Sequence, residues 1–218
     1  MRVRFIYSKR GGACFVPHIA LAQLFSRSAV RAGLEPVMTQ GFSPRAKISF
    51  GPELPAGVVA LKEPVDMYFN DGNDEKILQS SADINREISS ENLNSKANLL
   101  LKQKFAINLS LPEGFKISQL FFPEESSPAI GKLCTHAEYI VRTRFKLTEY
   151  AKKFFGDEMI ICEEIDDWLR FIIKAPAQHP IGGFVKFLKG ENAITGWHEI
   201  NIVRAAIGQF NGEKIFLS

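Results

Sequence analysis

The 218-residue sequence lacks several features that would restrict its function at once. No apolar run approaches the roughly 18–20 residues that span a membrane, and the opening MRVRFIYSKR lacks the apolar core of a signal peptide. Cysteine is scarce, because Cys14, Cys134 and Cys162 are the only three and lie far apart. We therefore expect a cytoplasmic protein with reduced thiols and no membrane segment.

The sequence also lacks the motifs of common catalytic and cofactor sites. It contains no Walker or G-x-S-x-G pattern and no cysteine triplet for an iron–sulfur cluster. Cys134 and His136 are two potential metal ligands, which do not complete a site. The paired acids at 163–164 and 166–167 are neighbours that point to opposite faces of an extended chain, so we interpret them as solvated turn residues. We expect no cofactor, and no set of residues defines an active site.

Acidic residues are almost absent from the first 50 positions. This stretch holds eight Lys and Arg residues and one acid, Glu35, so it carries 8 − 1 = +7, and the remainder carries 3 − 7 = −4. A basic lobe of this kind favours a polyanionic partner such as RNA, a nucleotide or an acidic protein face. A solvated cationic surface with no partner is the alternative, and charge alone does not separate the two.

The stretch from Pro36 to Leu54 combines aromatic, basic and turn-forming residues. A Gln-Gly-Phe-Ser-Pro turn at 40–44 precedes Arg45 and Lys47, and a short apolar strand follows. Residues i and i+2 of a strand share a face, so the two cations point the same way. The pattern predicts an anion-binding surface with Phe42 beside it.

The periodicity of the first 122 residues predicts the order β-α-β-β-α-β, which is the split-βαβ or ferredoxin-like arrangement. The expected elements are a half-buried strand Arg2–Tyr7, a helix Pro17–Gly33, a short strand after Lys47, a strand Pro64–Phe69, a helix Leu99–Leu111 and a strand Phe115–Phe122. Residues 70–98 are polar and predict a flexible insertion with one short helix near Glu75–Gln79.

The expected helix at Pro17–Gly33 carries three candidate site residues. His18 lies in its first turn, where it could bind an anion at the positive helix end or form a local hydrogen bond. Arg27 and Arg31 are an i, i+4 pair of like charges, which repel unless an anion or an acid lies nearby. Gly11–Gly12 could cradle a phosphate, but a tight turn is the favoured interpretation.

The rest of the chain predicts a second α+β unit. Residues 123–135 resemble a linker or an ordered loop, and the expected elements after it are strand Glu138–Phe145, helix Leu147–Phe155, strands Met159–Glu164, Trp168–Lys174 and Gly182–Leu188, helix Thr195–Ala206 and strand Lys214–Leu217. We therefore expect an α+β fold of two tandem ferredoxin-like domains, residues 1–123 and 124–218, each an antiparallel sheet covered by helices.

Several motifs of the first half also match a known pattern. They are Tyr7-Ser8-Lys9, Pro17-His18-Ile19-Ala20, the segment Phe25 to Leu34 with Arg27 and Arg31, Thr39-Gln40-Gly41-Phe42-Ser43-Pro44, Lys47-Ile48-Ser49-Phe50, Leu54-Pro55-Ala56-Gly57 and Leu109 to Gly114. These segments resemble the radical SAM-linked proteins, a family of unknown function found next to, or fused behind, radical SAM enzymes with a B12-binding domain. The chain departs from the family pattern at Pro17 and Ala20, where the family has Ser and Asp, and at Ser43, where it has Asn.

The resemblance implies an accessory role beside a radical SAM enzyme with a B12-binding domain. The candidate positions that it supplies are His18, Arg27, Arg31, Gln40, Phe42 and Lys47, whereas Arg45 rests on the local charge pattern. Three functions stay open at this point. The chain is a binding module that holds RNA or another anion, as tandem ferredoxin-like RNA nucleases do; a protein-interaction scaffold anchored by Phe42; or an enzyme that uses His18 as a general acid or base.

Overall fold

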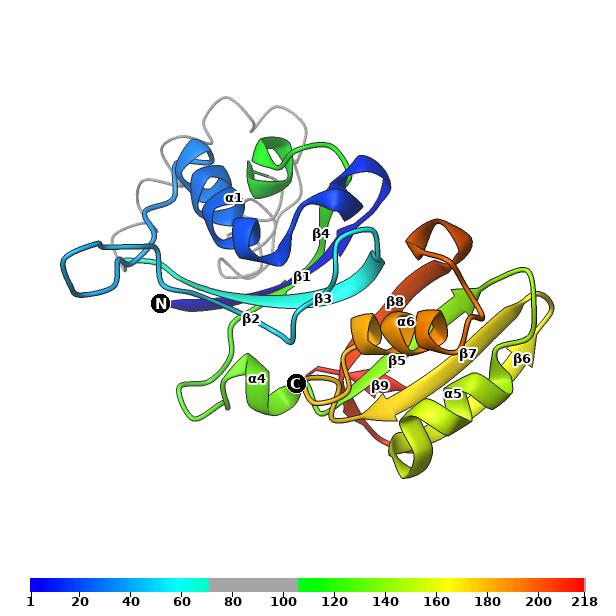
Figure 1. Ribbon diagram of the computed structural model, residues 1–218. Helices are drawn as coiled ribbons and strands as arrows, with labels where there is room; N and C mark the ends of the chain where they lie inside the picture. Colours follow the sequence, from blue (N-terminus) through cyan, green and yellow to red (C-terminus); the bar gives the residue numbers. More distant parts are fainter. Residues whose placement is uncertain (71–105, 218) are drawn as a thin grey trace, which may run out of the picture.

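The computed structural model describes residues 1–70 and 106–217. The fold is mixed α+β, with helices packed on one large and mostly antiparallel sheet (Figure 1). The strand order is β4-β1-β3-β8-β5-β7-β6, and β2 and β9 pair with β3 and β8 respectively. In the described part of the chain, no helix is long and apolar enough to cross a membrane.

The N-terminal half contributes four strands. In chain order its elements are β1 (Arg2–Lys9), the 3₁₀ turn η1 (Gly11–Phe15), α1 (His18–Arg31), β2 (Ile48–Phe50), β3 (Val59–Tyr68), a helical segment at 106–110 and β4 (Phe115–Phe121). Its sheet order is β4-β1-β3-β2, and every neighbouring pair is antiparallel.

The C-terminal half contributes the other five strands. Its elements are α4 (Ile130–Leu133), β5 (His136–Arg142), α5 (Thr148–Phe155), η2 (Gly156–Glu158), β6 (Met159–Ile165), β7 (Trp168–Lys174), α6 (Ile181–Gly190), η3 (Trp197–Glu199), β8 (Asn201–Phe210) and β9 (Ile215–Phe216). Its main order is β8-β5-β7-β6, again with antiparallel neighbours.

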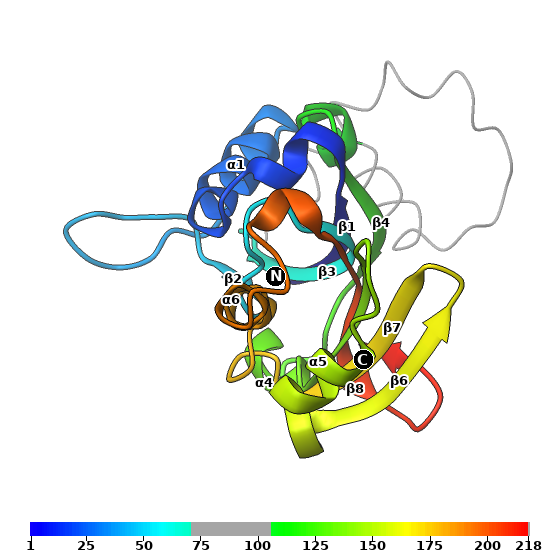
Figure 2. The ribbon, with the colours of Figure 1, turned by 45° about the vertical axis from the view of Figure 1, so that its right-hand side comes forward.

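The two halves join through a parallel pairing of β3 with β8. Val59 pairs with Val203 and Ala60 with Arg204. β3 therefore pairs with β8 at its beginning and with β2 at its end. Figures 1 and 2 show the resulting seam between the α1 side and the α6 side of the molecule.

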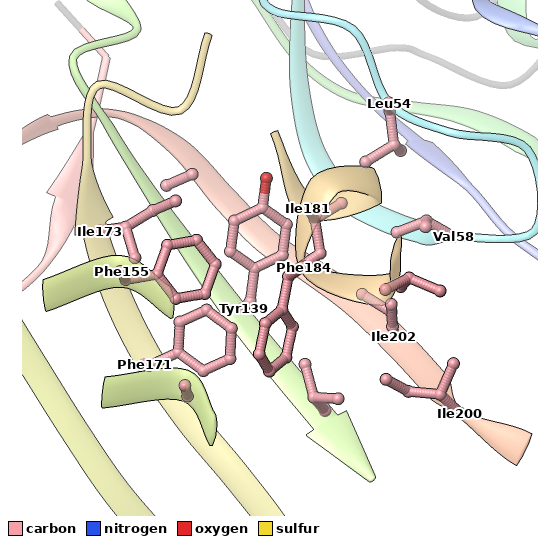
Figure 3. Packing of buried hydrophobic residues seen from close by; sticks show 14 of the residues in the cluster. Leu54, Val58, Tyr139, Phe155, Phe171, Ile173, Ile181, Phe184, Ile200 and Ile202 are labelled. Atoms are coloured by element: carbon pink, nitrogen blue, oxygen red, sulfur yellow. The ribbon is translucent and has the colours of Figure 1, made fainter. Parts of the chain in front are cut away.

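Two hydrophobic clusters lie on the helix-covered side of the sheet. In the first, α1 packs on β1 and β3, and the Phe25 ring lies 5.0 Å from the Tyr7 ring. In the second, α5 and α6 pack on β5 and β7 around Phe171 and Phe184. Leu54 and Val58 come from the N-terminal half, yet they belong to this second cluster (Figure 3). The segment before β3 is thus part of the core of the other half.

Most elements of the N-terminal half confirm the sequence-based expectations. The helix begins at His18 after Pro17 and ends before Gly33, whose φ of +78° suits the terminating turn. Leu21, Phe25 and Ser28 are buried, as the helical period predicts. The described part of the Leu99–Leu111 helix is helical at 106–110, whereas the expected insertion at 70–98 and the short helix at Glu75–Gln79 lie outside the described residues except for position 70.

Two predictions for the C-terminal half are wrong. Gly182–Leu188 is part of helix α6 and not a strand, because Ile181, Phe184, Val185 and Leu188 all face the core at helical spacing. The expected helix Thr195–Ala206 is instead the short turn η3 followed by strand β8. Sequence propensity at Ala205–Ala206 is overridden there because β8 pairs with β5, with β9 and with β3.

Two further expectations need correction. The segment 123–135 includes the short helix α4, and its residues Ile130, Leu133 and Cys134 are buried, Ile130 and Cys134 within the second cluster. Strand β1 is buried on both faces and not on one, since Arg4 and Ile6 are covered as well as the core residues. The basic side chains of β1 therefore lie inside the protein, with consequences for the surface charge.

Candidate functional site

Residues 37–47 form a hairpin that projects from the body of the protein at the left of Figure 1 and again in Figure 2. Its stem is held by backbone hydrogen bonds, since Thr39 N donates to Arg45 O and Lys47 N donates to Val37 O, both at 2.7 Å. The tip positions are exposed, and the Phe42 side chain is completely exposed. An aromatic ring is thus presented to solvent on an ordered stem.

The cations of the hairpin take the orientation that the strand period predicts. Arg45 and Lys47 are exposed, while the residues that follow each of them are partly covered. The Lys47 ammonium lies 4.3 Å from the centre of the Tyr68 ring, a cation–π contact that fixes its position. The structure thereby brings Gln40, Phe42, Arg45 and Lys47 together on one hairpin.

The two arginines of α1 lie on later turns of that helix and differ from each other. Arg31 donates to Ser28 Oγ at 3.3 Å and to Ser110 O at 3.1 Å, so part of its guanidinium is engaged locally. Arg27 is exposed and has no hydrogen bond or ion pair with any described residue. Arg27 is therefore the more available of the pair for an external anion.

Three of the eight N-terminal cations are not part of any basic surface. Arg2 and Arg4 share Asp66, and the Arg4 Nε lies 2.7 Å from Asp66 Oδ1 in a fully buried ion pair. Lys9 is also buried, with 1% of its surface exposed. The exposed cations of residues 1–50 are consequently Arg10, Arg27, Arg31, Arg45 and Lys47. The N-terminal surface is therefore basic, but it carries fewer positive charges than the count of Lys and Arg in residues 1–50 indicates.

A second buried ion pair crosses the seam. Arg204 of β8 donates through Nε and Nη2 to the two carboxylate oxygens of Glu63 of β3, at 2.7 and 2.5 Å. The same guanidinium donates to Pro52 O at 3.0 Å and Glu53 O at 3.3 Å. Arg204 thus binds the C-terminal half to β3 and also fixes the segment that follows β2.

Lys9 and His18 lie close to this pair. The Lys9 Nζ donates to Val16 O at 3.1 Å, and burial lowers the pKa of the ammonium. The His18 ring lies with its centroid 5.5 Å from that of Phe50. Burial lowers the pKa of His18 as well, opposed by the field of the Glu53 carboxylate. Burial therefore favours the neutral form of the His18 imidazole.

Sequence reasoning missed Lys9, Glu63 and Arg204 as members of one cluster. Arg204 shows the signal most clearly, because it is a single charge within the apolar run Val203-Arg204-Ala205. A charge in such a run is a signal of a buried partner, because an unpaired buried charge is costly. The identity of the partner, however, depends on a pairing between distant strands.

Comparison with protein-family models gives a match over the N-terminal part of the chain. The model of a family described as "Uncharacterized protein conserved in bacteria (DUF2344)" matches residues 2–91. That range holds the residues that form the hairpin, α1 and the N-terminal part of the seam. The description names no activity, ligand or partner. No curated protein matches the chain.

Proposed function

We propose that the chain is a non-catalytic binding protein and that its ligand is RNA, held by the 37–47 hairpin and the exposed arginines of α1. The observation that carries the proposal is Phe42, completely exposed at the hairpin tip above a stem that bears Arg45 and Lys47. A stacking ring beside cations is the arrangement by which proteins bind single-stranded nucleic acid. Gln40 adds a side chain that can hydrogen-bond to a base edge.

A second candidate function is the docking of a protein partner. Ile19 and Val30 on α1 and Met38 on the hairpin are exposed apolar side chains on the elements that carry the cations, and Ile19 is 89% exposed. Apolar side chains do not contribute to the binding of phosphate groups, whereas they would pack against a protein surface that carries apolar and acidic groups. In this function Phe42 is the central anchor.

The biological setting that we propose follows from the motif resemblance. We propose that the partner of the chain is a radical SAM enzyme with a B12-binding domain, to which the chain either delivers RNA or docks directly. The three free cysteines support our proposal that the chain and its partner meet in the cytoplasm. An enzymatic role for His18 is the least favoured alternative, because Pro17 and Ala20 supply no polar group beside it.

We also propose that each half is a ferredoxin-like domain, with the boundary near residue 123. The support is that each half follows the order β-α-β-β-α-β and that its strands lie in the order fourth, first, third, second. The α+β proteins that bind RNA through sheets of this kind provide an analogy at the level of the fold. Limited proteolysis whose first cleavage falls near residue 123 would support this division.

The RNA proposal is tested by binding of fluorescently labelled single-stranded RNA at two salt concentrations. The wild type should bind, and its affinity should fall steeply as salt rises. The Arg45→Ala, Lys47→Ala double variant should weaken binding and reduce the salt slope by about 1 for each phosphate that is no longer neutralised. Phe42→Ala should cost about 1–3 kcal/mol of binding free energy and leave the melting temperature unchanged.

The matched control is the Lys132→Ala, Lys189→Ala double variant, which removes two exposed cations from α4 and α6. It should bind RNA as the wild type does. If both double variants weaken binding equally, attraction is non-specific and the hairpin is not the site. Ribonuclease-resistant capture of the radical SAM enzyme, lost in Phe42→Ala, would instead establish the docking function.

A further inference from the structure

Lys9 is a buried cation without a counter-ion of its own. Its ammonium has three N–H donors, and the described residues provide one acceptor, the carbonyl of Val16 at 3.1 Å. The Cys14 thiol and the Glu63 carboxylate are the groups whose fields raise the pKa of the Lys9 ammonium. Both oxygens of that carboxylate, however, already accept hydrogen bonds from Arg204. Burying an ammonium in this way is unfavourable unless an anion accompanies it.

The Lys9 ammonium lies at the N-terminus of α1, because its acceptor Val16 precedes that helix by two residues. This end of the helix is uncapped. Pro17 provides no side-chain cap, and the first turn contains no acid. The amides of His18 and Ile19 have no acceptor within the described ranges. The positive end of this 14-residue helix thus lies beside the Lys9 ammonium.

His18 connects this place with solvent. The residue is half-buried and lies within the electrostatic field of Lys9. The segment 50–57 lies over it, since the Phe50 ring contacts His18 and Gly57 N donates to Cys14 O at 2.8 Å. The groups that meet here are an ammonium, an imidazole and backbone amides, all of which can donate hydrogen bonds to an oxyanion.

We propose that Lys9, His18 and the uncapped N-terminus of α1 form a binding site for the phosphate group of a ligand. A phosphate offers several acceptor oxygens and a charge that compensates the buried ammonium. Because Lys9 is almost fully covered, the ligand enters beside His18 and the Phe50 side chain, which contacts the His18 ring, moves aside. The site does not depend on RNA binding by the hairpin, and it can exist whether or not the hairpin binds RNA.

The test compares thermal unfolding in phosphate and in chloride at equal pH and ionic strength. The wild-type melting temperature should rise with phosphate concentration and saturate. Lys9→Met, which replaces the ammonium with an apolar chain of similar length, should be at least as stable as the wild type in chloride and gain nothing from phosphate. The surface control Lys62→Met should respond as the wild type does. An equal phosphate response in Lys9→Met and wild type, or no saturable response in wild type, would overturn the proposal.

A second measurement covers the case in which Lys9→Met does not fold. When phosphate is titrated into the wild type, the amide chemical shifts of His18 and Ile19 should change. His18→Gln should raise the dissociation constant for phosphate at least tenfold. Unchanged shifts at both residues would refute the site. The Arg45→Ala, Lys47→Ala variant should retain phosphate binding, so failure of the RNA proposal is separable from failure of this one.

Competition then identifies the source of the phosphate. A 5′-phosphorylated oligoribonucleotide that competes better than its 5′-hydroxyl counterpart would indicate an RNA end. Adenosine 5′-monophosphate that competes as well as the phosphorylated RNA would indicate a small phosphorylated ligand.

Discussion

Replacing Glu63 with leucine should destabilise the protein strongly, although Glu63 is not part of the hairpin. Glu63 provides both carboxylate oxygens that pair with Arg204, and both side chains are buried. Glu63→Leu leaves the guanidinium in the interior with two backbone carbonyls and the Tyr139 hydroxyl as its remaining hydrogen-bond partners. Lys9 would then share the seam with a second uncompensated cation, since the same carboxylate is the acid that acts on both.

The expected cost follows from these contacts. Removing one partner of a buried ion pair costs about 3–5 kcal/mol of unfolding free energy. For a protein of this size, roughly 2–4 °C of melting temperature corresponds to each kcal/mol, so a fall of about 6–20 °C is expected. The double variant Glu63→Leu, Arg204→Met removes both charges and leaves two carbonyls and the Tyr139 hydroxyl without this hydrogen-bond partner. It should lie within about 2 kcal/mol of the wild type.

Urea denaturation of the four proteins in this cycle measures the coupling between the two side chains. Glu163→Gln provides the control, because Glu163 is 53% exposed and pairs with Arg170 at the surface. That change should cost no more than about 1 kcal/mol. A Glu63→Leu cost below about 1 kcal/mol, or a double variant less stable than either single variant, would refute the interpretation of the seam as a charge-compensated junction.

Two further predictions concern other ionisable groups. Asp66→Asn removes the counter-charge that Arg2 and Arg4 share, and urea denaturation should show a loss of about 3–5 kcal/mol. The second concerns pH: because burial lowers the folded-state pKa of His18, the unfolded state binds the proton more readily. The unfolding free energy of wild type relative to His18→Gln should therefore be greatest above about pH 6.5 and decline as the pH falls through that value toward the lower folded pKa. A difference that is constant from pH 4 to 8 would contradict this sign.

Local patterns predicted the N-terminal half well because its signals are local. The presence of strand β1, the proline and glycine that bound α1 and the turn before Arg45 are each readable within a few residues, although the burial of both faces of β1 is not. The exposure of Arg45 and Lys47 on one side of the hairpin also follows from the strand period alone. These features provided the hairpin part of the candidate site.

The C-terminal half was predicted less well because its segments have mixed signals. Gly182–Gly183 disfavour a helix and the Phe and Val residues after them favour a strand locally, and only packing of α6 on α5 makes the helix the better solution. Ala205–Ala206 favours a helix until the surrounding strands are placed. The same limit applies to the seam, since nothing near Glu63 in the sequence indicates that its partner is Arg204.

The parallel join of β3 with β8 has a consequence for synthesis on the ribosome. Strand β3 leaves the ribosome early, whereas Arg204 and the rest of β8 emerge near the end of the described chain. Until then the Glu63 carboxylate has no guanidinium partner, and Leu54 and Val58 have no core to enter. The nascent N-terminal half is thus incomplete until β8 has emerged, and a chain truncated before Asn201 should be a substrate for chaperones and proteases.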